Sequence, residues 1–249
     1  MRILNLRARF GACLLCLFFF GLPLSGDIIS DNFNDNALDT SLWRPFFSGA
    51  TGSVSEINQR LEVTVTGAPE GFGGVALRGL VTGDFDLRIS YVLIGAFDSL
   101  DPDLYSQGVG FTWLPGTGSF LVRGVADIPG VGLTGCIGGQ VDSAIKQDCY
   151  AFTSEQSGSL RLTRSGNVYT MYHLENSVWA PLASAPSVQT GPVDFYFGAG
   201  IAGMTLNAAF DNFSLRSDGF RSEVPEPCSL ALAGIALGLG WRVRKRLSG

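Results

Sequence analysis

The sequence of 249 residues contains 17 Lys and Arg, 22 Asp and Glu and one His, so its formal net charge is −5. All 22 acidic residues lie between positions 27 and 226, where only 10 basic residues fall, and this region carries −12. Such an acidic region has no basic stripe to displace phosphate counterions, which excludes nucleic acid as a partner. Its charge fits solubility outside the membrane, and it also fits divalent cation binding.

The first 26 residues have the order of a secretory signal peptide. Three arginines precede an apolar stretch at 11–22, and Pro23 ends it before two small residues. We therefore expect a signal helix, export by the Sec machinery and cleavage near Asp27, with an uncleaved anchor as the alternative. Cys13 and Cys16 lie inside the apolar stretch rather than after it, which disfavours a lipoprotein.

From Asp27 onward, apolar and polar residues alternate between frequent turn residues, and no stretch shows a helical period. The pattern is clear at 61–66 and 85–91, and Ser165-Gly166-Asn167 predicts a hairpin turn. Further strands are expected at 75–78, 109–114, 120–125, 149–153, 160–164, 168–174, 193–201 and 207–215. The region 27–218 is thus predicted to be an all-β, two-sheet antiparallel sandwich of the jelly-roll kind.

Several short segments resemble concanavalin A-like lectin/glucanase (LamG-like) domains. They are DNFN at 31–34, LW at 42–43, GDFD at 83–86, LRLTRSGN at 160–167 and FDNF at 210–213. The resemblance spans most of the body and implies the sandwich fold. Because these motifs are short, they support a fold better than an activity.

The glucanases of that fold carry two glutamates around an aspartate on one strand, and the sequence lacks this motif. Its glutamates are scattered, whereas retaining glycoside hydrolysis needs two carboxyl groups about 5 Å apart. Asp84 and Asp86 share a strand face but are interpreted as solvent-facing residues. His173 has no serine or cysteine partner suggested by spacing. We therefore expect no enzyme.

Aromatic side chains offer stacking surfaces for sugar rings. The candidates for ligand contact are Trp179, Trp113, Tyr105 and Trp43, of which Trp179 follows a predicted turn at 175–177. The alternative is that these rings fill the core of the sandwich.

No cofactor is expected, apart from a structural calcium ion as an alternative. Asp31 and Asp211 lie in similar Asp-Asn-Phe sequences near the first and last strands, which are neighbours if the terminal strands pair. They could share a cation, or cap strand ends with Phe33 and Phe213 in the core. A second acidic cluster, also open to calcium or to loop formation alone, is Asp98, Asp101 and Asp103.

Cys136 and Cys149 are the two cysteines of the body. An oxidising compartment and an intervening Gly-rich loop of 12 residues predict a disulfide, which would contribute about 3 kcal/mol. Two thiols and a single His do not make a four-ligand zinc site.

The C-terminus has a fixed order of motif, apolar segment and basic cluster, which resembles the PEP-CTERM sorting signal. The motif is Pro225, Glu226 and Pro227. The apolar segment contains Ser229, Leu230, Leu232, Ile235, Leu237, Leu239 and Trp241, and the basic anchor is Arg242, Arg244, Lys245 and Arg246. In that family an exosortase is thought to process the tail at the tripeptide.

Physical reasoning supports this interpretation of residues 219–249 as a linker and a sorting tail. The two prolines exclude a helix around Glu226 and leave an extended, accessible segment. The apolar segment of about 13 residues is about 20 Å long as a helix, shorter than the ~30 Å hydrocarbon core. A basic cluster that snorkels makes a short transmembrane helix feasible, while a core helix is the alternative.

These features together predict an exported bacterial envelope protein that is anchored transiently in the inner membrane, processed by exosortase, and then placed at the cell surface or in the extracellular matrix. The body is expected to be non-catalytic, with extracellular polysaccharide as a candidate partner. The first alternative is a carbohydrate-binding, lectin-like module, and the second is a glycoside hydrolase.

Overall fold

The computed structural model describes residues 26–67, 71–94, 108–114, 119–128, 132–142, 145–201 and 205–222. The expected signal helix, the sorting tail, Tyr105 and the aspartates at 98, 101 and 103 lie outside these ranges. Within them every regular element is a β-strand. These residues include no helix that is long and apolar enough to cross a bilayer.

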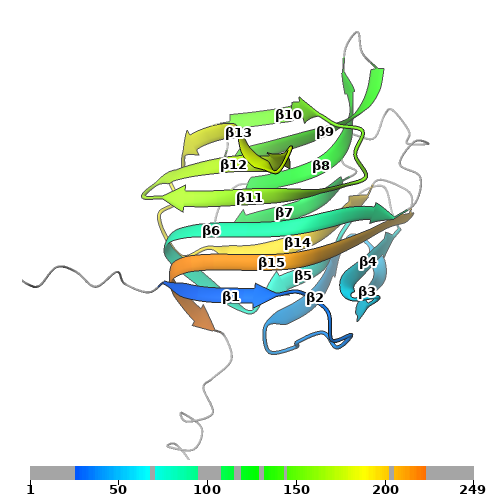
Figure 1. Cartoon of the computed structure of the whole chain (residues 1–249), viewed down its shortest axis with the longest axis horizontal. Coiled ribbons are helices and arrows are strands. Elements are labelled where there is room, and N and C mark those ends of the chain that lie inside the picture. The colour runs from blue at the N-terminus through cyan, green and yellow to red at the C-terminus, as the bar shows by residue number, and fades with distance from the viewer. Residues whose placement is uncertain are drawn as a thin grey trace, which may run out of the picture.

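The strands form two antiparallel sheets that pack face to face (Figure 1). The eight-stranded sheet has the order β13-β12-β11-β6-β15-β4-β3, and β1 pairs with β15 beside β4. Its strands are β1 (Asp27–Asp31), β3 (Thr51–Ile57), β4 (Arg60–Thr66), β6 (Gly79–Ile94), β11 (Ser157–Ser165), β12 (Val168–Glu175), β13 (Val178–Pro186) and β15 (Thr205–Ser222).

The seven-stranded sheet lies behind the first in Figure 1 and has the order β10-β9-β8-β7-β14-β5-β2. Its strands are β2 (Trp43–Ser48), β5 (Gly71–Leu77), β7 (Gly108–Leu114), β8 (Ser119–Ile128), β9 (Gly132–Val141), β10 (Ile145–Phe152) and β14 (Asp194–Ile201). The predicted all-β, two-sheet antiparallel sandwich is therefore confirmed.

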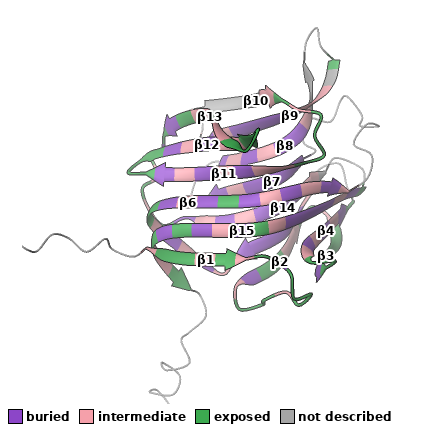
Figure 2. Ribbon diagram, viewed as in Figure 1, coloured by how far each residue is buried: buried purple, intermediate pink, exposed green. Residues whose placement is uncertain are grey.

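Alternate residues of the central strands fill the space between the sheets (Figure 2). In β6, Leu87, Ile89 and Tyr91 are buried, while the residues between them face outward, as the period of two in a strand requires. An aromatic cluster occupies one end of the core, where the ring centroids of Trp43 and Phe197 lie 5.0 Å apart in an edge-on arrangement.

The strands that the sequence pattern missed are β1, β2, β3, β9 and β13. The segment between the two cysteines, expected as a loop, is instead part of the β9–β10 hairpin. The last strand also continues to Ser222, so residues 219–222 extend the sandwich rather than the linker.

The predicted disulfide between Cys136 and Cys149 is not present in the structure and stays a prediction. Cys136 lies opposite Phe152, whereas Cys149 falls in the irregular stretch between Gln147 and Ala151. The Sγ atom of Cys149 donates to the carbonyl oxygen of Ala151 at 3.6 Å.

At one end of the eight-stranded sheet, β13 contains Pro181 and Pro186 and has a bulge at its centre. The ladder skips Leu182, so the two prolines lie opposite Tyr172 and Val168, four residues apart on β12. The bulge therefore gives both prolines the same place in the alternating hydrogen-bond pattern of an antiparallel pair.

A buried arginine of β11 joins β6 to the loop between β13 and β14. Arg164 is 3% exposed and donates to the carbonyl oxygens of Gly83 and Gly191 and to the hydroxyl of Tyr169. Its guanidinium group also lies 5.2 Å from the ring centroid of Phe85. These carbonyls would lose their donors if the side chain were removed.

We predict that Arg164→Met lowers the free energy of unfolding by about 2 to 3 kcal/mol, because the hydrogen bonds of a buried guanidinium group are lost, including the buried one to Tyr169. Urea unfolding followed by tryptophan fluorescence measures the change. Arg44→Met, which removes an exposed arginine from β2, is the control and should change stability by less than about 0.5 kcal/mol. Equal losses in the two variants would contradict the role assigned to Arg164.

Candidate functional site

Polar and aromatic side chains gather on the outer face of the eight-stranded sheet, the sheet nearest the viewer in Figure 1. They come from β6, β11, β12 and β13, which are adjacent in the sheet. We call one group the arginine patch and define it as Asp86, Arg88, Arg161, Tyr172 and Trp179.

Asp86 holds two arginines at the centre of this patch. Arg161 Nε and Nη2 donate to its two carboxylate oxygens at 2.8 and 2.9 Å, and Arg88 Nε and Nη2 donate to the same oxygens at 3.2 and 2.6 Å. Arg88 and Arg161 are cross-strand neighbours, so both reach Asp86 from positions set by the sheet. Each arginine thus makes a bidentate contact with the Asp86 carboxylate.

The charges within the patch shift the pKa of Asp86 downward. Burial opposes ionisation of this carboxyl group, but the hydrogen bonds and positive charges of Arg88 and Arg161 outweigh it, so the pKa lies below its ordinary value. The pKa of Arg88 is raised by its hydrogen bond to Asp86. Asp86 and Arg88 are therefore both charged at neutral pH.

Aromatic rings cover the two guanidinium groups. The guanidinium carbon of Arg161 lies 4.9 Å from the ring centroid of Tyr172 and 5.8 Å from that of Trp179, and Arg88 lies 5.9 Å from Trp179. Trp179 itself is partly exposed. The predicted ligand residue Trp179 is thus placed at the surface, on top of a fixed charge cluster.

A polar groove of about 520 Å³ adjoins the patch. Ser90 and Ser159 connect the groove to the patch, because they lie two residues along β6 and β11 from Arg88 and Arg161. The two serines share a hydrogen bond of 3.0 Å. The groove is lined by Asn34, Asn58, Gln59, Arg60, Ser90, Tyr91, Val92, Ser157, Gly158, Ser159, Ala209, Phe210 and Asp211.

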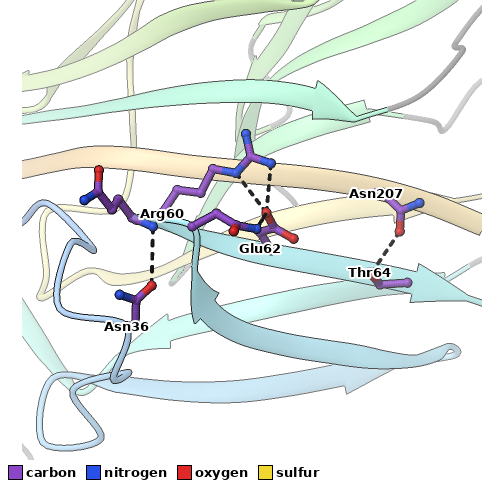
Figure 3. A network of polar contacts seen from close by, with 7 residues as sticks. Asn36, Arg60, Glu62, Thr64 and Asn207 are labelled. Atoms are coloured by element: carbon purple, nitrogen blue, oxygen red, sulfur yellow. Dashed lines mark hydrogen bonds and ion pairs between the residues drawn. The ribbon is translucent and has the colours of Figure 1, made fainter.

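Hydrogen bonds fix the rim of the polar groove at the β3–β4 turn (Figure 3). Arg60 Nε and Nη2 donate to Glu62 Oε1 at 2.9 and 2.8 Å, and Asn58 Nδ2 donates to the same oxygen at 3.0 Å. The amide of Gln59 donates to Asn36 Oδ1 at 3.4 Å, which connects the turn to the loop after β1. The amide and hydroxyl groups of the groove therefore stand on a rigid support.

Two carboxyl groups meet beneath this loop. Glu56, 4% exposed, accepts hydrogen bonds from the amides of Asp35 and Asn36, both at 3.0 Å. Burial raises its pKa, and the neighbouring Asp35 and Asp31 raise it further. The Asp35 carboxyl thus lies near that of Glu56, whose Oε1 is held by two backbone amides of the loop.

Asp31 accepts hydrogen bonds at the end of β1. Its Oδ1 accepts from the amide of Phe33 at 2.8 Å, and its Oδ2 accepts from Trp43 Nε1 at 2.7 Å. These bonds hold Phe33 at φ 50°, an uncommon conformation for a bulky residue. As expected if the terminal strands pair, Asp31 lies opposite Phe213, while Asp211 Oδ1 accepts from its neighbouring Asn212 amide at 2.6 Å.

Phe33 and Phe213 are both in the core, as the strand-end interpretation of Asp31 and Asp211 expects. Across the described ranges, His, Cys, Asp and Glu side chains nowhere gather in a group of three able to hold a metal ion.

Two of the predicted stacking residues are core residues instead. Trp113 is 3% exposed and stacks on Tyr169 at 5.9 Å, and Trp43 is fully buried. Their place between the sheets corrects the prediction of ligand contact. Asp84 accepts from the amide of Gly166 at 2.7 Å and supports the β11–β12 hairpin, as expected for a solvent-facing strand residue.

Sequence reasoning missed the two arginines of the patch and the amides of the groove. The alternation at 85–91 already places Asp86, Arg88 and Ser90 on one face. It does not show which strand lies beside β6, and Arg161 reaches Asp86 only through the β6–β11 pairing, 75 residues apart in the chain.

No family model matches the sequence, and no curated protein does so either. Solved structures with the same fold do exist. The VIP36 exoplasmic/lumenal domain in its Ca²⁺/Man3GlcNAc-bound form aligns with a TM-score of 0.50 and 14% identity over 81% of this chain and 94% of that one. The carbohydrate recognition domain of Emp46p, metal-free, aligns with a TM-score of 0.50 and 12% identity over 76% and 95%. The fold is that of concanavalin A-like lectin domains.

We predict that Glu56→Gln stabilises the protein at neutral pH and loses this advantage in acid. A carboxyl group whose folded-state pKa is raised binds more protons when folded, so ionisation above its ordinary pKa opposes folding. Glutamine keeps the acceptor oxygen without the charge. Unfolding free energies between pH 3 and pH 8 measure the difference, which should grow as pH rises. A variant less stable than the parent at pH 7 would contradict this account.

Proposed function

We propose that this chain is an exported envelope protein whose sandwich binds extracellular polysaccharide without cleaving it. The observation that carries the proposal is the outer face of the eight-stranded sheet, where a rigid polar groove continues into the arginine patch. Sugar rings present hydroxyl groups along their edges and C–H groups on their faces, and they bind surfaces that offer polar groups together with aromatic rings.

The groove supplies hydrogen-bond donors and acceptors for the hydroxyl groups of a sugar. Ser90 and Ser159 have hydroxyls that both donate and accept, Asn34 and Asn58 have amides, and Asp211 has an acceptor carboxylate. Tyr172 of β12 and Trp179 of β13 supply the aromatic surface, next to Arg88 and Arg161. The fold is one in which the Emp46p domain recognises carbohydrate, and this likeness agrees with the proposal without assigning a ligand.

The second part of the proposal concerns delivery. The order of motif, apolar segment and basic cluster from Pro225 to Arg246 supports recognition of the tail by exosortase after Sec-dependent export. In this account the tail holds the protein at the inner membrane only until processing. The sandwich then reaches the cell surface or the matrix, where a polysaccharide-binding face has its partner.

We predict that Trp179→Ala lowers glycan affinity of the full chain by about five- to tenfold, because a stacking surface worth ~1 kcal/mol is lost. A glycan array identifies the ligand, and titration of that ligand measures the change. Val178→Ala is the matched control, since Val178 is the adjacent residue of β13 and is 66% exposed. Unchanged binding by Trp179→Ala, or failure to bind any glycan on the array, would count against the proposed surface.

Intact-mass analysis of the extracellular protein tests the delivery. Processing at both ends predicts a chain that begins near Asp27 and ends close to Pro225, and Glu226→Ala should leave the longer form in the membrane fraction. The same measurement, made with and without reductant, reports any disulfide between Cys136 and Cys149. An envelope-purified protein that keeps its complete tail would contradict processing.

A further inference from the structure

The arginine patch carries more positive charge than its structural role requires. One arginine would balance Asp86, yet Arg88 and Arg161 both bind it, and the register places Arg216 of β15 directly opposite Asp86 on its other side. Two of the 10 basic residues in the region 27–226 thus bind one carboxylate, and a third lies opposite it on the next strand. Asp86 and its two bound arginines together carry +1 within a region of −12.

Donor groups of this patch are available to a ligand. Arg88 and Arg161 each use Nε and Nη2 for Asp86, and within the described part of the chain their Nη1 groups donate to no residue. The side chain of Arg161 is only 22% exposed. A partly buried excess charge costs free energy unless an anion balances it, and aromatic walls strengthen that attraction by excluding water.

We propose that the polysaccharide bound by this face is acidic, and that the Nη1 groups of Arg88 and Arg161 bind its carboxylate or sulfate groups. The proposal rests on the proposed function and names the class of ligand. The neutral part of the polymer lies in the polar groove, where Ser90, Ser159 and Asn58 meet its hydroxyls. The anionic group lies two residues along β6 and β11, a step of about 7 Å, which is within the reach of one sugar unit.

Carboxylate and sulfate groups suit these donors. The Nη1–H groups of a guanidinium make charge-assisted hydrogen bonds to such anions, which are about twice as strong as neutral hydrogen bonds. Asp86 competes for the same cations. It keeps both arginines in place when no ligand is bound, and it also weakens the attraction that they exert on a second anion.

The test compares acidic polymers with their neutral counterparts on the full chain purified in a nonionic detergent. The probes are polygalacturonate with its carboxyl-reduced form, and dextran sulfate with dextran. We expect at least one acidic polymer to bind about tenfold or more tightly than its neutral counterpart. Arg88→Gln should lower the affinity for the acidic polymer about tenfold. Arg44→Gln, the same charge change on the other sheet, should leave that affinity unchanged.

Asp86→Asn separates a binding role from a structural one. If the arginines bind an anion, removal of the competing carboxylate should raise the affinity for the acidic polymer about threefold or more, although the variant is less stable. A purely structural cluster predicts no such gain. Thermal unfolding confirms that each variant is folded at the temperature of the titration.

Each outcome decides a separate point. Equal binding of acidic and neutral polymers overturns the acidic ligand and leaves polysaccharide binding intact. Preference for the acidic polymer with equal losses in Arg88→Gln and Arg44→Gln, or with no gain in Asp86→Asn, shows an unspecific charge effect and overturns the assigned site. If none of the four polymers binds, the acidic ligand fails, and a negative glycan array extends the failure to the proposed function.

Discussion

The two faces of a β-strand constrain everything on the surface of this protein. In β6, each residue that points outward is fixed by a neighbour that must point into the core, because a shift of one residue would expose Leu87 and bury Asp86. The core therefore determines the register, and the register determines the surface. The two-residue spacing from Arg88 to Ser90 that joins the arginine patch to the polar groove follows from this constraint.

Strands whose outer face is solvated could be predicted from the sequence. At 61–66 and 85–91, polar and apolar residues alternate because one face meets water and the other meets the opposite sheet. Most of the strands that were missed lie at sheet edges or are short, as β1, β2, β3 and β13 do, and the first two supply few alternating residues.

The central strand β9 was missed for a different reason. A Cβ atom on Gly139 would lie 2.6 Å from the Sδ atom of Met171, and one on Gly135 would lie 2.5 Å from Nη2 of Arg123. Core side chains from other strands press against this backbone, so only glycine fits, and glycine-rich sequence indicates a loop. The proposed binding face could not be predicted for another reason. Arg161 and Trp179 meet Asp86 and Arg88 only after strands distant in the sequence have paired.

Buried polar groups complete the sandwich at its rims rather than at its centre. Arg164 donates to carbonyl groups of β6 and of the loop between β13 and β14, and Glu56 accepts from the loop after β1. Each side chain satisfies backbone groups that no strand partner reaches. The rims are thereby held as firmly as the sheets, which is why a groove that borders a loop and a turn has a fixed shape.

The equivalent placement of Pro181 and Pro186 in β13 affects how the edge of this sheet can pair with another copy of the protein. Proline fits an edge strand where its missing N–H would face away from the sheet, so the outer side of β13 lacks hydrogen-bond donors at matching intervals. A strand from another copy cannot extend the sheet across those gaps. The two prolines thus make this edge a poor template for a strand of another copy.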